Sequence, residues 1–257
     1  MGHVDALRSV EPMIEARNLT KRHGAQTVVE DLTFALQPGT VTGFLGPNGA
    51  GKSSTMRMVV GLDRPTSGTV TVGGRPYVES PAPMQLLGAM IDAKAVHPAR
   101  TARAHLTGLA LTHGIGRRRV NTVLEMTGLA SVATKRIRTF SLGMGQRLGI
   151  ATALLGDPQV LMLDEPVNGL DPQGVVWVRQ LCRSYAAQGR TVLLSSHNMA
   201  ETAATADRLV VIGNGRKVAD GTTDQLLAAS PRRDATLEDV FFDLTAGHTT
   251  HDAGAIR

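Results

Sequence analysis

One short segment constrains the fold of this chain more than any other. Residues 46–53 read Gly-Pro-Asn-Gly-Ala-Gly-Lys-Ser, which fits the pattern G-x-x-x-x-G-K-[ST] without a mismatch. Such a loop must curl so that consecutive backbone N–H groups point inward at an anion, and glycine takes the required positive φ angles without a Cβ clash. The segment therefore predicts a cradle for the phosphates of a nucleotide.

Each position of the loop has an expected task. Gly46, Gly49 and Gly51 are expected to supply the positive φ angles. Lys52 can reach the β and γ phosphates, and the Ser53 hydroxyl can ligate Mg²⁺. The predicted nucleotide contacts of the loop are Gly46, Pro47, Asn48, Gly49, Ala50, Gly51, Lys52, Ser53 and Ser54.

The flanking segments predict a strand before the loop and a helix after it. Residues 40–45 are β-branched and apolar, as in a buried strand, and residues 54–61 have the pattern of a helix. The phosphates would then lie at a helix N-terminus, where unpaired N–H groups and the helix dipole favour negative charge. The alternative, a glycine-rich turn that happens to contain a lysine, is disfavoured by this setting.

The remaining hydrophobic patterns predict an α/β fold with two additions. Alternating segments between residues 13 and 36, with a turn at 21–26, and a strand at 69–72 predict an antiparallel β layer on the core. Residues 83–157 carry alanine, leucine, threonine and arginine at helical spacing, which predicts a mostly helical subdomain inserted into the core. The core then resumes with strands at 160–163, 191–194 and 208–212 and with helices at 173–188 and 199–206.

Length and composition fit one large folded domain. The chain has 257 residues, of which 42% are apolar and 19% are charged. We expect the domain to span residues 13–245, with 1–12 as a flexible leader and 246–257 as a flexible tail. The only cysteine, Cys182, excludes an internal disulfide and is interpreted as a packing residue.

Charge and hydropathy bear on the partners and the location. The net charge is +5, yet the basic clusters at 117–119 and 135–138 contain no aromatic residue that could stack on a base, so no nucleic-acid partner is expected. We interpret these clusters as solvent-exposed helix faces. A minor role of the excess positive charge would be attraction to nearby anionic lipid. No apolar run approaches the roughly 20 residues that span a bilayer. The N-terminus does not resemble a secretory signal, so a cytoplasmic chain is expected.

A second motif predicts hydrolysis of the nucleotide. Residues 160–163 form an apolar strand that ends in the adjacent carboxylates Asp164 and Glu165. Asp164 is placed to hold Mg²⁺, as acidic residues do in P-loop NTPases. Glu165 is the candidate general base for the attacking water, a role typically worth about 10² to 10⁴ in rate. The alternative, an exposed Asp-Glu pair opening a turn before Pro166, is weakened by the phosphate loop upstream.

His197 follows another apolar strand, at residues 192–194. In an open α/β sheet, residues at the carboxyl ends of the strands line the ligand crevice, so this histidine should face the same pocket as Asp164. Its imidazole can donate to a γ-phosphate oxygen and orient Glu165 or the water. A histidine at a helix start is more often structural than catalytic, but the order of the motifs along the chain favours a catalytic role here.

The order of these motifs resembles that of the nucleotide-binding subunits of ABC transporters, over about residues 13–245. The segments Phe-Ser-Leu-Gly-Met at 140–144 and Leu-Glu-Asp-Val-Phe at 237–241 are similar to those of bacterial drug and antibiotic-resistance exporters. The resemblance implies a P-loop NTPase core, ATP hydrolysis, and ATP and Mg²⁺ as cofactors. The motifs that carry it are the phosphate loop, Ser141–Arg147, Asp164–Glu165, Asn168–Asp171 and His197.

The resemblance also implies partners. A second ATP-binding subunit, expected to be identical, would pair head to tail, with two ATP molecules between the subunits. Ser141 and Gly143 of one subunit would contact the γ-phosphate held by the other, and Asp171 would lie at that interface. A separate transmembrane permease would dock on a groove around Asp92–Leu111. The chain would thus be peripheral on the inner face of the cell membrane, exporting a drug or antibiotic.

Three features depart from the family pattern. Leu142 and Met144 replace a glycine and a glutamine of the usual Leu-Ser-Gly-Gly-Gln signature, a variant that is similar to the exporter subgroup. Asp92 occupies the expected place of a glutamine that helps to hold the metal, which predicts altered metal coupling because an ionised carboxylate cannot donate a hydrogen bond. His23 occupies the place of the tyrosine that stacks on adenine, which predicts loose base selectivity.

Two other functions were weighed against a membrane exporter. Soluble ABC ATPases of translation carry two such domains in one chain, and those of DNA repair separate the two motifs by a long coiled coil, whereas 87 residues lie between Lys52 and Phe140 here. A P-loop kinase is disfavoured by the signature segment and by His197. A soluble ABC ATPase is therefore the main alternative.

Overall fold

A six-stranded sheet positions the phosphate loop. The computed structural model describes residues 11–229 and 236–245, so most of the expected leader and the whole expected tail lie outside the described residues. In the sheet the strands follow the order β5-β6-β7-β3-β8-β9. They are parallel except for β9, which runs antiparallel to β8. Their bounds are β3 (Val41–Leu45), β5 (Leu87–Met90), β6 (Val160–Leu163), β7 (Thr191–Ser196), β8 (Arg208–Gly213) and β9 (Arg216–Gly221).

The expected antiparallel β layer is a three-stranded sheet of order β2-β1-β4. It consists of β1 (Ile14–His23), β2 (Gln26–Leu36) and β4 (Ser67–Val72). The predicted turn at 21–26 is shorter in the structure, because His23 already pairs with Gln26 and the chain reverses through Gly24 at a φ of 58°. Glycine adopts this left-handed conformation readily, which allows a tight hairpin.

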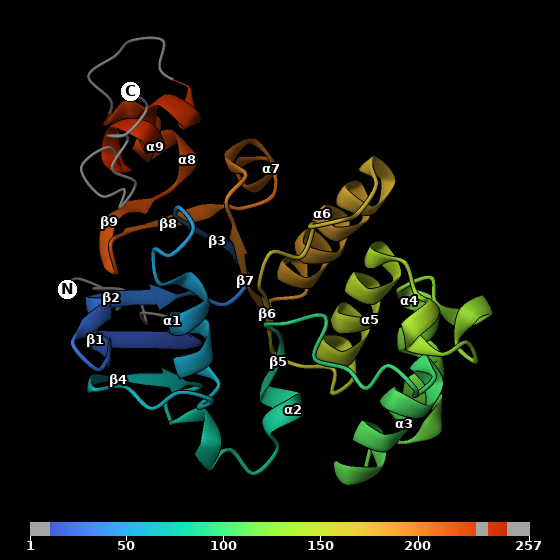
Figure 1. The fold of residues 1–257 in the computed structure, drawn as a ribbon. Helices are drawn as coiled ribbons and strands as arrows, with labels where there is room; N and C mark the ends of the chain where they lie inside the picture. The colour runs from blue at the N-terminus through green and yellow to red at the C-terminus, as the bar shows by residue number, and fades with distance from the viewer. Residues whose placement is uncertain (1–10, 230–235, 246–257) are drawn as a thin grey trace, which may run out of the picture.

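The helices divide between the two sides of the molecule, as Figure 1 shows. α1 lies beside the antiparallel strands, and α3, α4 and α5 gather on the opposite side of the central strands. The longer helices are α1 (Lys52–Val59), α3 (Ala102–Thr112), α4 (Arg117–Met126), α5 (Leu142–Leu154), α6 (Pro172–Ala187) and α9 (Leu237–Thr245). The short ones are α2 (Pro83–Leu86), α7 (Met199–Ala203), α8 (Thr223–Ala228) and the 3₁₀ turns Tyr77–Glu79, Ala130–Val132 and Ile137–Thr139.

The segment 83–157 differs from its predicted helical character at its start. Residues Leu87–Met90 form β5 at the edge of the central sheet, where they pair in parallel with β6. Leu87 and Met90 bury their side chains on the two faces of that sheet. The four residues are too few for a period of two to be separated from a period of 3.6, which is why the helical pattern around them concealed the strand. The first long helix of the segment is α3, which begins at Ala102.

The central sheet is buried on both faces. Along β6, Leu161 and Leu163 pack into a core shared with α5 and α6, while Val160 and Met162 pack into a second core under α1 and the antiparallel sheet. This alternation is the period of two that a strand imposes on its side chains. Cys182 on α6 is fully buried in the first core, and burial raises the pKa of its thiol to about 12. It is therefore a packing residue.

No helix within residues 11–229 and 236–245 is both long and apolar enough to cross a bilayer.

Candidate functional site

The phosphate loop joins β3 to α1. Gly49 and Gly51 adopt positive φ angles of 81° and 101°, as expected. The expectation was wrong for Gly46, which is not among the glycines with positive φ. Gly46 is needed for a different reason, because a Cβ there would lie 2.5 Å from the carbonyl oxygen of Ile212. The start of the loop therefore depends on close packing against β8.

Lys52 is held inside this loop. Its side chain is 7% exposed, and its Nζ donates hydrogen bonds to the carbonyl oxygens of Gly46 at 2.6 Å and Pro47 at 3.2 Å. Burial lowers the pKa of Lys52, and the nearby carboxylates of Glu165 and Asp164 partly oppose that effect. A buried ammonium group at a helix N-terminus is a suitable partner for an anionic phosphate.

Asp164 is fixed by two hydroxyl groups from different elements. Ser53 Oγ at the start of α1 donates to Asp164 Oδ2 at 2.7 Å, and Ser195 Oγ on β7 donates to Asp164 Oδ1. The backbone N–H of Asp164 donates to the carbonyl oxygen of Met90 at 2.7 Å. Ser53 and Asp164 therefore converge at the carboxyl end of the sheet, and their oxygen atoms are of the type that Mg²⁺ prefers.

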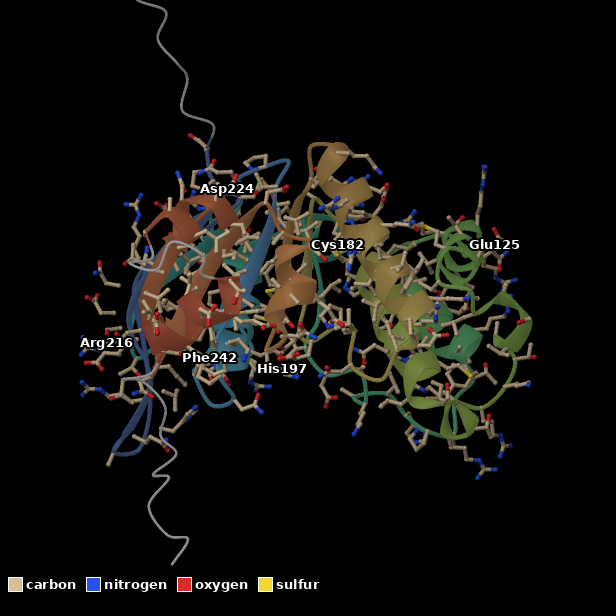
Figure 2. The ribbon with its side chains drawn as sticks, turned by 90° about the horizontal axis from the view of Figure 1, so that it is seen from above. Glu125, Cys182, His197, Arg216, Asp224 and Phe242 are labelled. Carbon is tan, nitrogen blue, oxygen red and sulfur yellow. The ribbon has the colours of Figure 1, made fainter. Side chains whose placement is uncertain are left out.

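Glu165 and His197 meet at the same edge of the sheet. Nδ1 of His197 lies 2.8 Å from Glu165 Oε2, and Lys52 Nζ lies 4.0 Å from Glu165 Oε1. In Figure 2, His197 lies between the part of the molecule that carries Arg216 and the helical part that carries Glu125. A carboxylate bound to an imidazole beside a phosphate-binding lysine can accept a proton from water.

A cavity of about 610 Å³ opens beside these carboxylates. Asp92 is exposed at its wall, and its Oδ1 accepts a hydrogen bond from the backbone N–H of Lys94 at 2.8 Å. The lining includes residues from the core and from the helical region, among them Asp92, Ser141, Gln146, Asp164, Glu165 and Asn168.

Three predicted nucleotide contacts lie outside the phosphate loop in the sequence. Ser141 caps α5, where its Oγ accepts a hydrogen bond from the backbone N–H of Met144 at 3.2 Å. Within the described ranges, neither Ser141 nor Gly143 makes a hydrogen bond or ion pair with the phosphate loop. His23 is exposed at the end of β1, next to the turn of the hairpin. Ser141 and Gly143 are therefore not linked to residues 46–54 by a hydrogen bond within one chain, and His23 is accessible to a ligand.

Two residues of the site were not predicted from the sequence. Ser195 directly follows the strand expected at 191–194, and Gln146 lies in the signature segment, but neither was assigned a role of its own. In the structure, Ser195 Oγ donates to the carboxylate of Asp164 and accepts a hydrogen bond from the backbone N–H of Glu165 at 3.0 Å. Gln146 Nε2 donates to the carbonyl oxygen of Glu165 at 2.8 Å. A polar residue at the end of an apolar strand was the available signal for Ser195, whereas nothing local marked Gln146.

Comparisons with known proteins agree with this geometry. The ABC transporter family model matches residues 29–168. The linearmycin resistance ATP-binding protein LnrL of Bacillus subtilis (strain 168) is 38% identical over 221 residues, covering 83% of this chain and 70% of that protein. The Nod factor export ATP-binding protein I of Burkholderia orbicola (strain AU 1054) is 40% identical over 227 residues, which cover 85% of this chain and 73% of that protein.

Solved structures show the same fold. An ATP-binding subunit of an ABC transporter superposes with a TM-score of 0.82 at 29% identity, covering 90% of this chain and 99% of that chain. A dimeric bacterial ABC transporter cassette superposes with a TM-score of 0.75 at 22% identity, and the match covers 82% of this chain and 98% of that chain. The fold and the site thus define a P-loop ATPase. The chain belongs to the ABC transporter family, as an ATP-binding subunit that hydrolyses ATP.

Proposed function

We propose that this subunit powers an exporter through a separate transmembrane permease. The observation that carries the proposal is the convergence of Lys52, Ser53, Asp164, Glu165 and His197 at one sheet edge. The relatives support the direction of transport, because one is a linearmycin resistance protein and another a Nod factor export protein. A drug or antibiotic is the proposed class of cargo.

The residues fit ATP with Mg²⁺ as the cofactors. The structure has no group of three or more His, Cys, Asp or Glu side chains suited to a metal within residues 11–229 and 236–245. Mg²⁺ does not need one, since it usually takes one or two protein oxygens and completes its shell with water and substrate phosphates. Ser53 and Asp164 would hold it, with Asp92 at the wall of the same cavity. Bound there, Mg²⁺ neutralises charge that develops on the phosphates.

The remaining groups of the site have separate tasks in hydrolysis. The backbone N–H groups of residues 46–54 and the Lys52 ammonium would bind the phosphates. Glu165 would accept a proton from the attacking water as that water bonds to the γ-phosphorus and the bond to ADP breaks. His197 would keep the Glu165 carboxylate in place and donate to a γ-phosphate oxygen. His23 would contact the base.

We propose a head-to-tail dimer of identical chains. Ser141 and Gly143 lie at the N-terminus of the thirteen-residue helix α5 and make no hydrogen bond to the phosphate loop of their own chain. Backbone N–H groups at a helix start attract phosphate, so this end of α5 can complete the site of a second subunit. ATP would then hold the two subunits together, and hydrolysis would release them.

The permease would dock in a groove between the central sheet and the helical region. This groove measures about 570 Å³, and most of its wall is apolar. Its lining includes Tyr77, Met90, Asp92, Val96, His105 and Leu109. An amphipathic helix of the permease could place apolar side chains there. The chain would thereby be held on the inner face of the cell membrane.

Two measurements test this function. Purified protein with MgATP and no added acceptor should release free phosphate, whereas a kinase would require an acceptor. Affinity purification of the full chain from membranes should recover a transmembrane permease. A chain carrying Leu62→Glu, at a position of the groove wall that is 62% exposed, should recover less of it while retaining ATP hydrolysis. Recovery of the chain without any membrane partner would favour the alternative, a soluble ABC ATPase.

A further inference from the structure

The backbone of Glu165 is held in an unusual conformation. Its φ angle is 48°, in the left-handed region that glycine favours and glutamate rarely adopts. Such a residue persists only where its surroundings fix it, and it is common at functional sites. Glu165 directly follows β6, so this turn of the backbone decides where its carboxylate points.

Both peptide groups of Glu165 are fixed by side chains. On the amino side, its N–H donates to Ser195 Oγ at 3.0 Å. On the carboxyl side, its carbonyl oxygen accepts Gln146 Nε2 at 2.8 Å and the backbone N–H of Asn168 at 3.2 Å. Gln146 is only 6% exposed, so its amide is committed to this contact in a region with little competing water.

The same helix touches the loop after Glu165 at a second point. Gly169 has a φ of 75°, and a Cβ placed on it would collide with Cδ2 of Leu142. The Leu142 side chain therefore covers Gly169, one turn of α5 before Gln146. Two successive turns of α5 contact the segment 165–169, so displacement of the start of α5 must also displace that segment.

We propose that Gln146 is a positioning residue that holds Glu165 in its left-handed conformation and links the start of α5 to the general base. The start of α5 carries Ser141, which would bind the phosphate of the facing subunit. Gln146 therefore connects occupancy of one ATP site to the alignment of Glu165 in the other. This inference rests on the proposed role of Glu165.

The test compares two isosteric variants with a matched control. Gln146→Met keeps the length of the side chain but removes the N–H donor. Arg119→Met on α4 removes a donor to the carbonyl oxygen of Leu154, which lies 2.7 Å away at the far end of α5 from Gln146. We expect Gln146→Met to lower kcat about 10- to 100-fold, because a small misplacement of a catalytic group has that effect. Its KM for ATP and its ATP affinity should stay within about twofold, and Arg119→Met should keep kcat.

A second variant separates positioning from general stability. In Gln146→Glu the new carboxyl can donate to the Glu165 carbonyl only when protonated. Burial at this position favours the neutral carboxyl, so the kcat of Gln146→Glu relative to the unaltered protein should rise as the pH falls, while that of Gln146→Met stays flat. Thermal unfolding of each variant reports its stability separately.

The outcomes distinguish this inference from the proposed role of Glu165. A Gln146→Met protein with unchanged kcat, or one whose loss of kcat is matched by Arg119→Met at equal loss of stability, would overturn the positioning role. Glu165→Gln is measured in parallel. If Glu165→Gln hydrolyses ATP at the normal rate, the general-base assignment is wrong whatever Gln146 does.

Discussion

Nδ1 of His197 lies 2.8 Å from Oε2 of Glu165. The glutamate side chain is 21% exposed and the histidine side chain is 54% exposed, so the carboxylate is the more enclosed partner. The contact restricts the carboxylate to one orientation while the imidazole remains open to a ligand. Glu165 and His197 should therefore contribute unequally to hydrolysis.

We predict that Glu165→Gln lowers kcat by about 10² to 10⁴, the range typical of a general base, and that His197→Ala lowers it less. Glu165→Gln should bind MgATP with nearly normal affinity, because Glu165 does not hold the phosphates. His197→Ala should bind MgATP more weakly, because it loses a hydrogen-bond donor to the γ-phosphate. Steady-state phosphate release and equilibrium ATP binding provide the comparison. A His197→Ala protein as slow as Glu165→Gln would show that the imidazole has a chemical role of its own.

Much of the fold could be predicted because its signals are local. The strand at 160–163 coincides with β6, and the helix at 173–188 lies within one residue of α6 at both ends. β5 was missed because four residues within a helical pattern carry no distinct period. Its membership of the central sheet depends on pairing with β6, 70 residues later in the chain, which no local pattern reports.

We predict that Asp92→Gln changes the Mg²⁺ dependence of ATP hydrolysis. Asp92 is exposed on the wall of the cavity that Asp164 also lines, and glutamine is longer and offers an N–H donor in place of a negative charge. The Mg²⁺ concentration for half-maximal rate should shift about 10-fold or more, the effect typical of changing one residue that holds a metal through its outer shell. Asp224→Asn, on α8, serves as the control for lost negative charge. An unchanged Mg²⁺ titration in Asp92→Gln would remove Asp92 from the metal site.

His23 offers a prediction about base selectivity. Its side chain is exposed, and histidine presents a smaller ring to adenine than tyrosine does. His23→Tyr should tighten ATP binding about two- to tenfold, in line with about 0.5 to 1.5 kcal/mol for a stacked aromatic pair. The unaltered protein should bind ATP and GTP with similar affinities, whereas a strong preference for ATP would argue against loose selectivity. Titration with both nucleotides measures this, and thermal unfolding should not change.

The site was less predictable than the fold, for a physical reason. Lys52, Ser53, Asp164 and Glu165 are marked by motifs because phosphate and metal chemistry restricts the residue types at fixed spacings. Gln146 and Ser195 act on the backbone and carboxylate of other residues, through hydrogen bonds that span 19 and 30 positions of the chain. Many polar residues could make such bonds, so no motif identifies them and only the folded arrangement does.

Asp157 provides a prediction about stability and pH. It lies between α5 and β6, and its Oδ1 contacts Arg190 Nη1 at 2.8 Å and Arg119 Nη2 at 3.1 Å. The hydrogen bond from Arg190 is the main cause of the lowered pKa of this carboxyl, and the charge of Arg119 lowers that pKa further. The folded protein therefore favours the ionised form more than the unfolded chain does. The resulting stability is present above the unfolded pKa of about 3.9 and is lost as the pH falls through the lower folded value.

Asp157→Asn should accordingly destabilise the protein at pH 7, and this effect should begin to shrink below about pH 4 and vanish below the lower folded pKa of Asp157. Asparagine tolerates the positive φ of 54° at this position, so the change removes charge without straining the backbone. The Asp157 side chain is 55% exposed, and solvent screening limits the expected cost at pH 7 to about 0.5 to 1 kcal/mol. Thermal unfolding across this pH range measures it, with the exposed Glu125→Gln of α4 as the control. A difference that persists unchanged at pH 3 would mean that Asp157 stabilises the fold by packing and not by charge.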